Sequence, residues 1–387
     1  MRSSPLHHRV EKPTVLHVRV VTGTGGGPDK TILNSPRFLE SQYRTLCAYL
    51  HPPRDVGFDQ LRQRAKEWHA PLISIADRGP LDWRVIPQAM TVCRREKVAI
   101  WHGHDYKSNL LGVLLAKFWR MKLITTVHGW VKHTKRTPLY YAIDRFCLPR
   151  YQSVLAVSPD LHEQCLGVGV RADHCQLIEN AIDTEEFSRR RTSTQAKCEL
   201  GYKQNRFLIG AVGRLSEEKG FDLLIRAVAR LIEEGAPLEL AIVGEGSQME
   251  ELRSLAASLN CSEHIHLLGF RSDTKAIYEA MDLFVLSSHR EGLPNVLLEA
   301  QAMNVPVLST RIAGVPRLIE HEKSGWLIEP GSIDELTQGI QRLHQNESLR
   351  QSLAVEGRKV IESRYSFARR MERVAAIYDQ LLQRERS

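Results

Sequence analysis

Short apolar runs rich in β-branched residues alternate along this chain with longer stretches of helical period, and this alternation limits the folds open to it. Each run is nearly continuously apolar and is soon followed by Gly, Ser or His, which is typical of a strand buried on both faces of a parallel sheet. Strands and helices in alternation predict α/β units with right-handed crossovers. The predicted strands lie at 15–21, 98–101, 123–127, 154–157, 207–212, 238–243, 265–268 and 283–286.

The alternation breaks between Asp183 and Gln204, where polar and charged residues intervene, and it starts again at Phe207. A chain of 387 residues is long enough for two domains of ordinary size. We predict one domain over residues 1–185, a second over 186–360, and a C-terminal helix over 361–387 that packs across both. Ligands of open α/β sheets bind beyond the carboxyl ends of the strands, so two such sheets would present two binding edges to one central cleft.

The composition is that of a soluble globular protein, with 42% hydrophobic and 25% charged residues. No apolar run approaches the roughly 20 residues that cross a bilayer, and the first twelve residues lack the apolar core of a secretory signal. We therefore expect a cytoplasmic protein. Seven scattered cysteines without a Cys-x-x-Cys pair argue against a disulfide framework or a zinc cluster, so we expect reduced packing residues.

The net charge of +8 is unevenly distributed: residues 1–185 hold 26 Lys and Arg against 17 Asp and Glu. Such asymmetry predicts an anionic partner for the first half, either a membrane surface or nucleic acid. Basic and aromatic residues mix between 130 and 151 as in an interfacial segment, although a solvated basic helix explains them equally well. An interfacial segment would place the protein peripherally on the inner face of the plasma membrane. The residues concerned are Trp130, Lys132, Lys135, Arg136, Tyr140, Tyr141, Arg145, Phe146, Arg150 and Tyr151.

A glycine-rich loop, Gly23 to Pro28, follows the first predicted strand. Its glycines allow backbone N–H groups to approach an anion, and the next helix would add its positive end. A merely flexible loop is the alternative. The loop is not a Walker motif, because Asp29 precedes Lys30, and its glycines do not have the spacing of a dinucleotide fingerprint.

Three histidines follow predicted strands: His102, His104 and His128. Histidines at such positions can hydrogen-bond sugar hydroxyls or phosphate, or move protons near neutral pH. His128, which precedes a glycine, is the better candidate, whereas a structural role is as plausible for the other two. No ordered set of ligands supports a metal site.

In the second half, Arg214 and Lys219 both lie shortly before a predicted helix that starts near Phe221. Cations are unfavourable at a helix N-terminus unless an anion joins them, so we interpret the pair as a clamp for a diphosphate. Two solvated surface cations are the alternative.

The segment from Ser287 to Ala300 is the strongest signal in the sequence. Pro294 suits the first turn of a helix, which places Glu291 in the preceding loop and Glu299 inside the helix. Two carboxylates placed in this way can accept hydrogen bonds from hydroxyl pairs at separate points of one extended ligand. Helix capping could explain Glu291 but not Glu299.

These segments together resemble the retaining GT-B glycosyltransferases of glycosyltransferase family 4, and the resemblance covers nearly the whole chain. It includes the family's pair of glutamates separated by seven intervening residues, here Glu291 and Glu299. The other matching segments are the loop at 23–28, Val127-His128-Gly129, Ala156-Val157-Ser158, 178–183, Val212-Gly213-Arg214-Leu215 with Glu218-Lys219-Gly220, and 242–246.

The resemblance implies an α/β, GT-B architecture of two Rossmann-like domains facing a central cleft, with the nucleotide sugar held mainly by the second domain and the acceptor on the side of the first. Arg214 and Lys219 would bind the donor diphosphate, Glu291 the transferring sugar and Glu299 the ribose, while His128 would lie over the donor sugar. The catalytic set is then His128, Arg214, Lys219 and Glu291. Further donor contacts would come from Gly25, Gly26, Gly244, Gly269, Phe270, Gly292, Leu293, Pro294 and Asn295.

The family fixes no common residues where acceptors bind, and here that stretch contains His102, His104 and Asp105. The resemblance also implies a hexosyl-type transfer from a UDP- or GDP-sugar to a hydroxyl of a glycan or a lipid-linked saccharide, in cell-envelope or exopolysaccharide biosynthesis. Retention would follow from front-face attack. We expect no divalent metal and no other cofactor, because no Asp-x-Asp lies near a strand end. A departure is Ala181, where the family usually has Gly.

Two other classes remain as alternatives. A nucleotide-sugar epimerase of similar fold would bind a nucleotide, but would not be expected to carry the Arg-Lys and double-Glu pattern. A basic nucleic-acid-binding protein would suit the charge, yet the sequence has no recognisable helix-turn-helix, zinc-finger or RNP signature.

Overall fold

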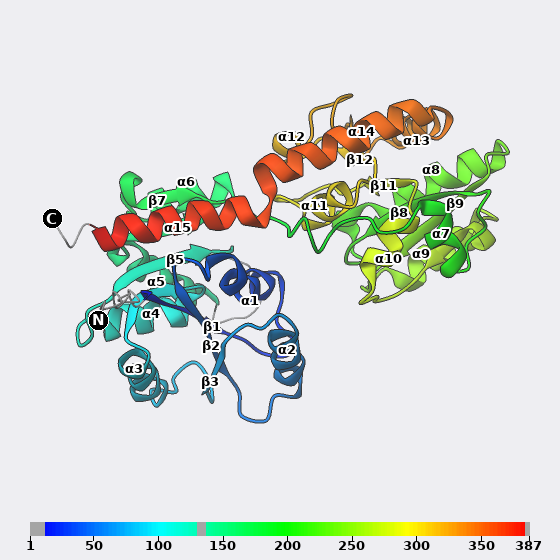
Figure 1. The fold of residues 1–387 in the computed structure, drawn as a ribbon. Helices are drawn as coiled ribbons and strands as arrows, with labels where there is room; N and C mark the ends of the chain where they lie inside the picture. Colours follow the sequence, from blue (N-terminus) through cyan, green and yellow to red (C-terminus); the bar gives the residue numbers. More distant parts are fainter. Residues whose placement is uncertain (1–11, 130–136, 384–387) are drawn as a thin grey trace, which may run out of the picture. The chain divides into compact units, whose positions relative to one another are not determined.

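The computed structural model describes residues 12–129 and 137–383, and the chain forms two compact units (Figure 1). The first unit comprises Met1–Glu179 together with Arg370–Ser387, and the second comprises Asn180–Arg369. The chain therefore leaves the first unit once and returns to it at the end.

The first unit is built on a seven-stranded parallel sheet with the strand order β3-β2-β1-β4-β5-β6-β7. The order reverses direction between β1 and β4, which makes the carboxyl ends of these two neighbours the topological switch point. The strands are β1 (Thr14–Val20), β2 (Arg44–His51), β3 (Leu72–Ala76), β4 (Val98–Gly103), β5 (Lys122–Val127), β6 (Ser153–Ala156) and β7 (Cys175–Leu177).

Helices join these strands, as right-handed crossovers between parallel strands require. Trp101 of β4 is fully buried in the resulting core, among aliphatic side chains from the sheet and the helices. The helices of this unit are α1 (Gly27–Leu39), α2 (Val56–Glu67), α3 (Val85–Arg95), α4 (Tyr106–Leu115), α5 (Thr137–Cys147), α6 (Pro159–Gly167) and most of α15 (Phe367–Gln383).

The second unit repeats the same plan in a six-stranded parallel sheet with the order β10-β9-β8-β11-β12-β13. Its switch point lies between β8 (Phe207–Val212) and β11 (Leu283–Leu286). The other strands are β9 (Leu238–Val243), β10 (Ile265–Leu267), β12 (Val307–Thr310) and β13 (Trp326–Ile328). The helices are α7 (Ser193–Glu199), α8 (Phe221–Glu233), α9 (Met249–Ser258), α10 (Thr274–Ala280), α11 (Asn295–Ala302), α12 (Val315–Leu318), α13 (Ile333–Gln345) and α14 (Glu347–Val360).

The predicted α/β class with parallel sheets is confirmed. Every predicted strand is present within a residue or two of its expected bounds, and β2, β3, β7, β12 and β13 are additional. β2 begins with Arg44 and Thr45, and the other four have only three to five residues, so their apolar runs are short.

The C-terminal segment is divided between the two units. After α14 the chain makes a wide π-helical turn (Ile361–Tyr365), and the backbone of Ile182 bonds to Tyr365 and Phe367 within the second unit. From Arg370 onward α15 belongs to the first unit, and Figure 1 shows it beside β7. There the Arg373 guanidinium donates to the carbonyl of Leu177 in β7 at 2.7 Å.

All seven cysteines are free thiols, and six of them are buried. Among the helices at residues 12–129 and 137–383, none is both long and apolar enough to cross a membrane.

Candidate functional site

In the second unit, the loops that follow β8 and β11 meet at the switch point. Lys219 lies in a short 3-10 turn (Glu217–Lys219) between β8 and α8, and Glu291 lies between β11 and α11. The Lys219 Nζ atom is 2.5 Å from Glu291 Oε1, and the hydroxyl of Ser288 donates to the same oxygen at 2.9 Å. The structure therefore brings together two predicted site residues that are 72 positions apart.

Both side chains of this ion pair retain some exposure, 18% for Lys219 and 13% for Glu291. Because each of the two side chains can reach solvent, each can exchange the other for a ligand. The ammonium group is a donor for a phosphate oxygen, and the carboxylate is an acceptor for a hydroxyl.

Hydrogen bonds to backbone carbonyls hold the two loops together. The amide of His289 donates to the carbonyl of Glu218 at 2.8 Å, and the Ser287 hydroxyl donates to the carbonyl of Lys219 at 2.9 Å. Gly220 has φ of +60°, and a Cβ there would lie 2.4 Å from the Ser287 carbonyl oxygen. Glycine is thus required at this crossing, and it allows the turn that carries Lys219 to lie directly against the loop that carries Glu291.

The loop after β9 lies against the loop after β8. The amide of Gly244 donates to the carbonyl of Gly269, and the amide of Leu215 donates to the carbonyl of Glu245, both at 2.9 Å. Arg214 is exposed in this region, and the Phe270 side chain is 73% exposed. The predicted base-binding segments at Gly244 and Gly269 are therefore neighbours.

Replacing Gly244 with alanine is expected to destabilise the second unit by several kcal/mol. Gly244 has φ of +143°, and a Cβ would lie 1.8 Å from the carbonyl oxygen of Gly213, so the two loops would have to separate. Differential scanning calorimetry checks this prediction, and Gly235→Ala is the matched control. That glycine also has a positive φ, +90°, but a Cβ would meet nothing within 4 Å. Equal losses in the two variants would contradict the role assigned to the loop contact.

Glu291 and Glu299 lie on either side of the start of α11. The helix begins at Asn295, so Pro294 occupies the cap position and not the first turn, a correction of one residue; its missing N–H costs no helical hydrogen bond there either. Glu299 accepts a hydrogen bond from the Tyr278 hydroxyl at 2.9 Å, which gives this carboxylate a partner within the protein. Gly292, exposed before the helix, accepts a bond from the amide of Gly314 at 3.3 Å.

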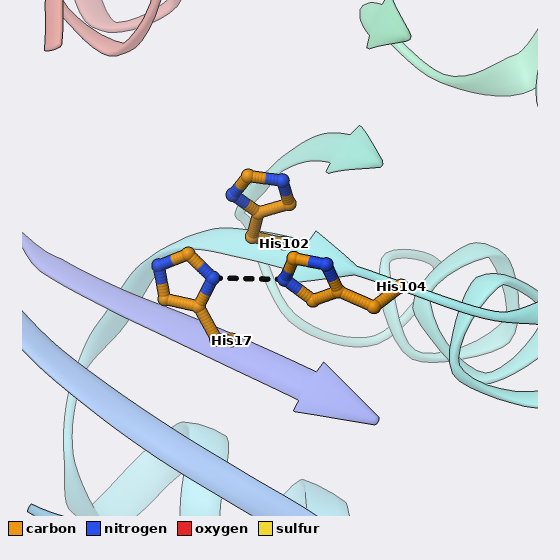
Figure 2. A group of neighbouring side chains, drawn as sticks. All are labelled: His17, His102 and His104. Carbon is orange, nitrogen blue, oxygen red and sulfur yellow. Dashed lines mark hydrogen bonds between the residues drawn. The ribbon is translucent and has the colours of Figure 1, made fainter. Parts of the chain in front are cut away.

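In the first unit, four histidines gather at the switch point of the sheet. His17 lies in β1, His102 in β4, His104 just beyond β4, and His128 just beyond β5. His17 Nδ1 is 2.9 Å from His104 Nε2, and His104 Nδ1 is 3.0 Å from His128 Nε2. Figure 2 shows His17 and His104 joined by the first of these bonds, with His102 above them; the ring centroids of His102 and His104 are 4.5 Å apart.

All four imidazoles are held neutral. Burial lowers the pKa of His17 to about 3, and burial also carries the pKa of His102, His104 and His128 well below the usual histidine value. The positive charge of Arg370, itself buried, lowers the pKa of His17, His102 and His128 further. The group consequently offers hydrogen bonds and not charge at neutral pH.

His102 and Asp105, predicted on the acceptor side, are already engaged inside the protein. His102 is 2% exposed, with Nδ1 bonded to the Tyr378 hydroxyl at 2.7 Å and Nε2 to Thr126 Oγ1 at 2.8 Å. Asp105 caps α4 and accepts a bond from the amide of Val20 at 2.7 Å. Burial raises the pKa of the Asp105 carboxyl. As acceptor-binding groups these residues, like buried His104, stay a prediction.

The glycine-rich loop leads into α1, where an internal carboxylate occupies part of the predicted anion site. The amide of Gly26 donates to Asp29 Oδ2 at 2.6 Å, and the buried Asp29 also lies 3.1 Å from the Arg19 guanidinium. Gly25 has φ of +76°, and a Cβ there would lie 2.6 Å from Asp29 Oδ2. In this conformation the Gly26 amide bonds to the protein itself.

His17, His102 and His104 could in principle hold a metal ion, because their ligand atoms lie within 4.8 Å of one another. Both nitrogens of each ring already take part in hydrogen bonds, and the buried cation of Arg370 disfavours a further positive charge nearby. These contacts explain the cluster without a metal.

Part of the basic segment predicted between 130 and 151 lies outside the described residues, namely 130–136, and with them Trp130, Lys132, Lys135 and Arg136. Tyr151 is 1% exposed and donates to the carbonyl of Asn109, so its prediction as an interfacial residue is wrong: it is a core residue. Phe146 is 56% exposed, and the Arg150 guanidinium lies over its ring. The tyrosine pair of Tyr106 and Tyr140 stacks with centroids 4.4 Å apart.

Several residues of these two sites were not predicted: Ser288 and Tyr278 in the second unit, and His17, Ser35 and Arg370 in the first. His17 carried a signal, since a polar ring inside an apolar strand is unusual, but its partners come from distant segments. The signal for Ser288 was its position three residues before Glu291.

Solved structures share this architecture. HepE from Anabaena, crystallised with UDP, superposes with a TM-score of 0.79 over 95% of this chain and 100% of its own, at 19% sequence identity. Two parallel sheets of Rossmann order in one chain, matched over their full length, define a protein of the GT-B fold.

Family comparisons identify the chain more closely. The model described as Glycosyltransferase Family 4 matches residues 16–186, and the model described as Glycosyl transferases group 1 matches residues 193–360. The chain belongs to glycosyltransferase family 4 and is a nucleotide-sugar-dependent, retaining glycosyltransferase.

Curated relatives have low sequence identity to this chain, but the similarity extends over most of its length. The capsular polysaccharide biosynthesis glycosyltransferase CapM of Staphylococcus aureus is 26% identical over 314 residues, 78% of this chain and 82% of CapM. The UDP-Gal:alpha-D-GlcNAc-diphosphoundecaprenol alpha-1,3-galactosyltransferase of Escherichia coli is 27% identical over 307 residues, 77% of this chain and 79% of that enzyme.

Proposed function

We propose that this glycosyltransferase moves a sugar from a UDP- or GDP-linked donor to a hydroxyl of a glycan or lipid-linked saccharide during cell-envelope or exopolysaccharide assembly. The observation that carries the donor half of the proposal is the contact of Lys219 with Glu291 at the switch point of the second sheet. A cation and a carboxylate side by side match the two ends of a sugar diphosphate, since one end carries anionic oxygens and the other hydroxyl groups.

In the second unit, Lys219 and exposed Arg214 would bind the diphosphate, Glu291 the transferring sugar and Glu299 the ribose hydroxyls. When the donor binds, Lys219 would exchange its contact with Glu291 for one with the diphosphate. Glu299 would likewise exchange its hydrogen bond from Tyr278 for one from the ribose. Backbone amides between Gly292 and Asn295, with Leu293 and Pro294 in that turn, would contact the sugar. The segments at Gly244, Gly269 and Phe270 would border the base.

In the first unit, His128 would lie over the donor sugar, Gly25 and Gly26 would approach a phosphate or sugar, and the acceptor would bind near His102, His104 and Asp105. For a lipid-linked acceptor we place the protein peripherally at the inner face of the plasma membrane. Support for that location comes from the excess of basic residues in positions 1–185 and from the exposed ring of Phe146.

The chemistry requires stabilisation of two developing charges. As the bond between the anomeric carbon and the phosphate oxygen breaks, positive charge develops on the sugar and negative charge on the diphosphate, which Arg214, Lys219 and loop amides would stabilise. We propose attack by the acceptor hydroxyl from the same face, with the departing phosphate oxygen accepting the hydroxyl proton. The new glycosidic bond forms with retained configuration, and nucleoside diphosphate leaves. Neither a divalent metal nor another cofactor enters this scheme.

The functions for which the relatives are named support the choice of donor and acceptor. CapM is named for capsular polysaccharide biosynthesis, the Escherichia coli enzyme for transfer from UDP-Gal to a diphosphoundecaprenol-linked sugar, and HepE was crystallised with UDP. We therefore favour a UDP-sugar as the first donor to examine.

The proposal predicts that one class of nucleotide raises the melting temperature of the purified protein. A ligand at 100 times its Kd stabilises the folded state by about 2.7 kcal/mol, which corresponds to a shift of several degrees for a domain of this size. The screen compares UDP, GDP and ADP with their sugars in a thermal-shift assay. Glu299→Ala should abolish most of the shift.

Glu233→Ala, at an exposed position near the end of α8, is the matched control and should keep the full shift. No shift with any nucleotide, or an equal shift in the Glu299 variant, would contradict the donor site assigned here.

A further inference from the structure

Three histidines and one serine form a continuous line of hydrogen bonds inside the first unit. Ser35 Oγ lies 3.3 Å from His17 Nε2, His17 Nδ1 lies 2.9 Å from His104 Nε2, and His104 Nδ1 lies 3.0 Å from His128 Nε2. Ser35 is buried in α1, whereas His128 is only partly buried at the end of β5. The line therefore runs from the core to a residue that can meet a ligand.

Counting protons gives this line a direction. The Ser35 hydroxyl donates its one proton to the carbonyl of Ile32 at 2.8 Å, so its oxygen can only accept from His17 Nε2–H. A neutral imidazole carries one N–H, which leaves His17 Nδ1 as an acceptor for His104 Nε2–H. By the same count His104 Nδ1 accepts from His128 Nε2–H, and the lone pair of His128 lies on Nδ1.

Each imidazole carries a single N–H only while it is neutral. Burial and nearby cations keep all three rings neutral. His17 and His104 are 3% and 5% exposed, and burial is the largest cause of the lowered pKa of His17, His104 and His128. Nearby cations lower the pKa further: Arg370 acts on His17 and His128, and Arg19 acts on His104 and His128. A second proton on any ring is therefore strongly disfavoured, and the tautomer of one ring determines the next.

We propose that Ser35, through His17 and His104, fixes His128 in the tautomer that bears its lone pair on Nδ1, so that this edge accepts a hydrogen bond from a ligand hydroxyl. The opposite tautomer would present an N–H at the same place and would suit a phosphate oxygen. Ser35, His17 and His104 are positioning residues in this scheme, since none of them needs to touch the ligand. That the hydroxyl belongs to a sugar rests on the proposed function; the tautomer itself does not.

His102 provides an internal comparison. Its ring stacks on His17 and His104, with centroids 4.6 and 4.5 Å apart, but its hydrogen bonds go to Tyr378 and Thr126 and not into the line. Removing a bond from His102 thus disturbs the same cluster without changing the proton count along the line.

The test is nitrogen NMR of the full-length protein labelled with ¹⁵N-histidine, in which protonated and lone-pair ring nitrogens are distinguished directly. In the wild type we expect His128 to carry its proton on Nε2. Ser35→Ala removes the acceptor at the buried end, so both tautomers of His128 should become populated. Ser35→Thr keeps the hydroxyl and should restore the single tautomer, and Thr126→Val should leave His128 unchanged.

Activity provides a second readout in the same variants. With a working donor and acceptor, Ser35→Ala is expected to lower kcat/KM about tenfold and Ser35→Thr to restore most of it. A wild-type His128 protonated on Nδ1, or a Ser35→Ala protein with an unchanged single tautomer, would overturn the inference. If no sugar transfer is found with any donor, the proposed function fails while the NMR result still decides the tautomer.

Discussion

Replacing Glu291 with glutamine is expected to lower kcat/KM for sugar transfer at least 100-fold while leaving the protein folded. Glutamine keeps the size of the side chain but removes the negative charge that faces Lys219 at 2.5 Å and accepts from Ser288. Loss of one preorganised polar group at a reacting centre costs about 100- to 1,000-fold in rate. Steady-state kinetics with the donor found in the thermal-shift screen would measure the effect.

Lys219→Ala should cause a loss of similar size, and the double variant should lose much less than the product of the two single losses. Residues in direct contact act as a unit, and their effects are not additive. Glu217→Gln, an exposed change in the same turn, is the matched control and should keep full activity. Full activity in the Glu291 or Lys219 variant, or strict additivity, would refute the shared role.

Lowering the pH from 7 to 5.5 is expected to destabilise the first unit strongly. His17, His102, His104 and His128 are neutral when folded because their pKa is depressed, whereas in the unfolded chain each titrates near 6.5. The unfolded state thus binds more protons below pH 6.5, and stability falls as pH falls through that value. The loss is roughly 1 kcal/mol for each ring, so the unit should melt about 10 °C lower at pH 5.5.

Calorimetry between pH 8 and 5.5 would measure this slope. His102→Asn removes one of these four histidines and should reduce the slope by about a quarter, whatever its effect on stability at pH 8. His69→Asn, at an exposed position with φ of +52°, which asparagine tolerates, should leave the slope unchanged. A melting temperature that stays the same over this range would show that the rings are accessible to protons in the folded protein.

The sequence predicted the two sheets well, because strands buried on both faces leave continuous apolar runs. Strands with weaker runs were missed: β2 begins with Arg44 and Thr45, and β13 contains only three residues. The proximity of Lys219 and Glu291 could be predicted, since both residues follow strands that adjoin the switch point. Their direct pairing was not predicted, because loop geometry decides whether two such side chains touch.

The line of hydrogen bonds between the histidines could not be predicted from the sequence, for a different reason. His17 and His104 are 87 positions apart, and their contact depends on β1 and β4 being neighbours in the sheet, which no local pattern encodes. The bond from His102 to Tyr378 spans 276 positions and depends on where α15 packs. For Asp105 and Gly26 the sequence indicated binding groups, but the structure shows internal hydrogen bonds, because capping and ligand binding use the same residue types.

The route of the chain also has a consequence for biosynthesis. The first unit is complete only with Arg370–Ser387, whereas the second unit is one uninterrupted stretch, Asn180–Arg369. On the ribosome all of the second unit is therefore synthesised before residues 370–383 of α15, and it can fold while the first unit still lacks Tyr378 and Arg370. Domains generally fold in the order of synthesis, but here the first unit must wait until the whole second unit has been synthesised. The buried His102 at its centre acquires its partner Tyr378 only after α15 has emerged.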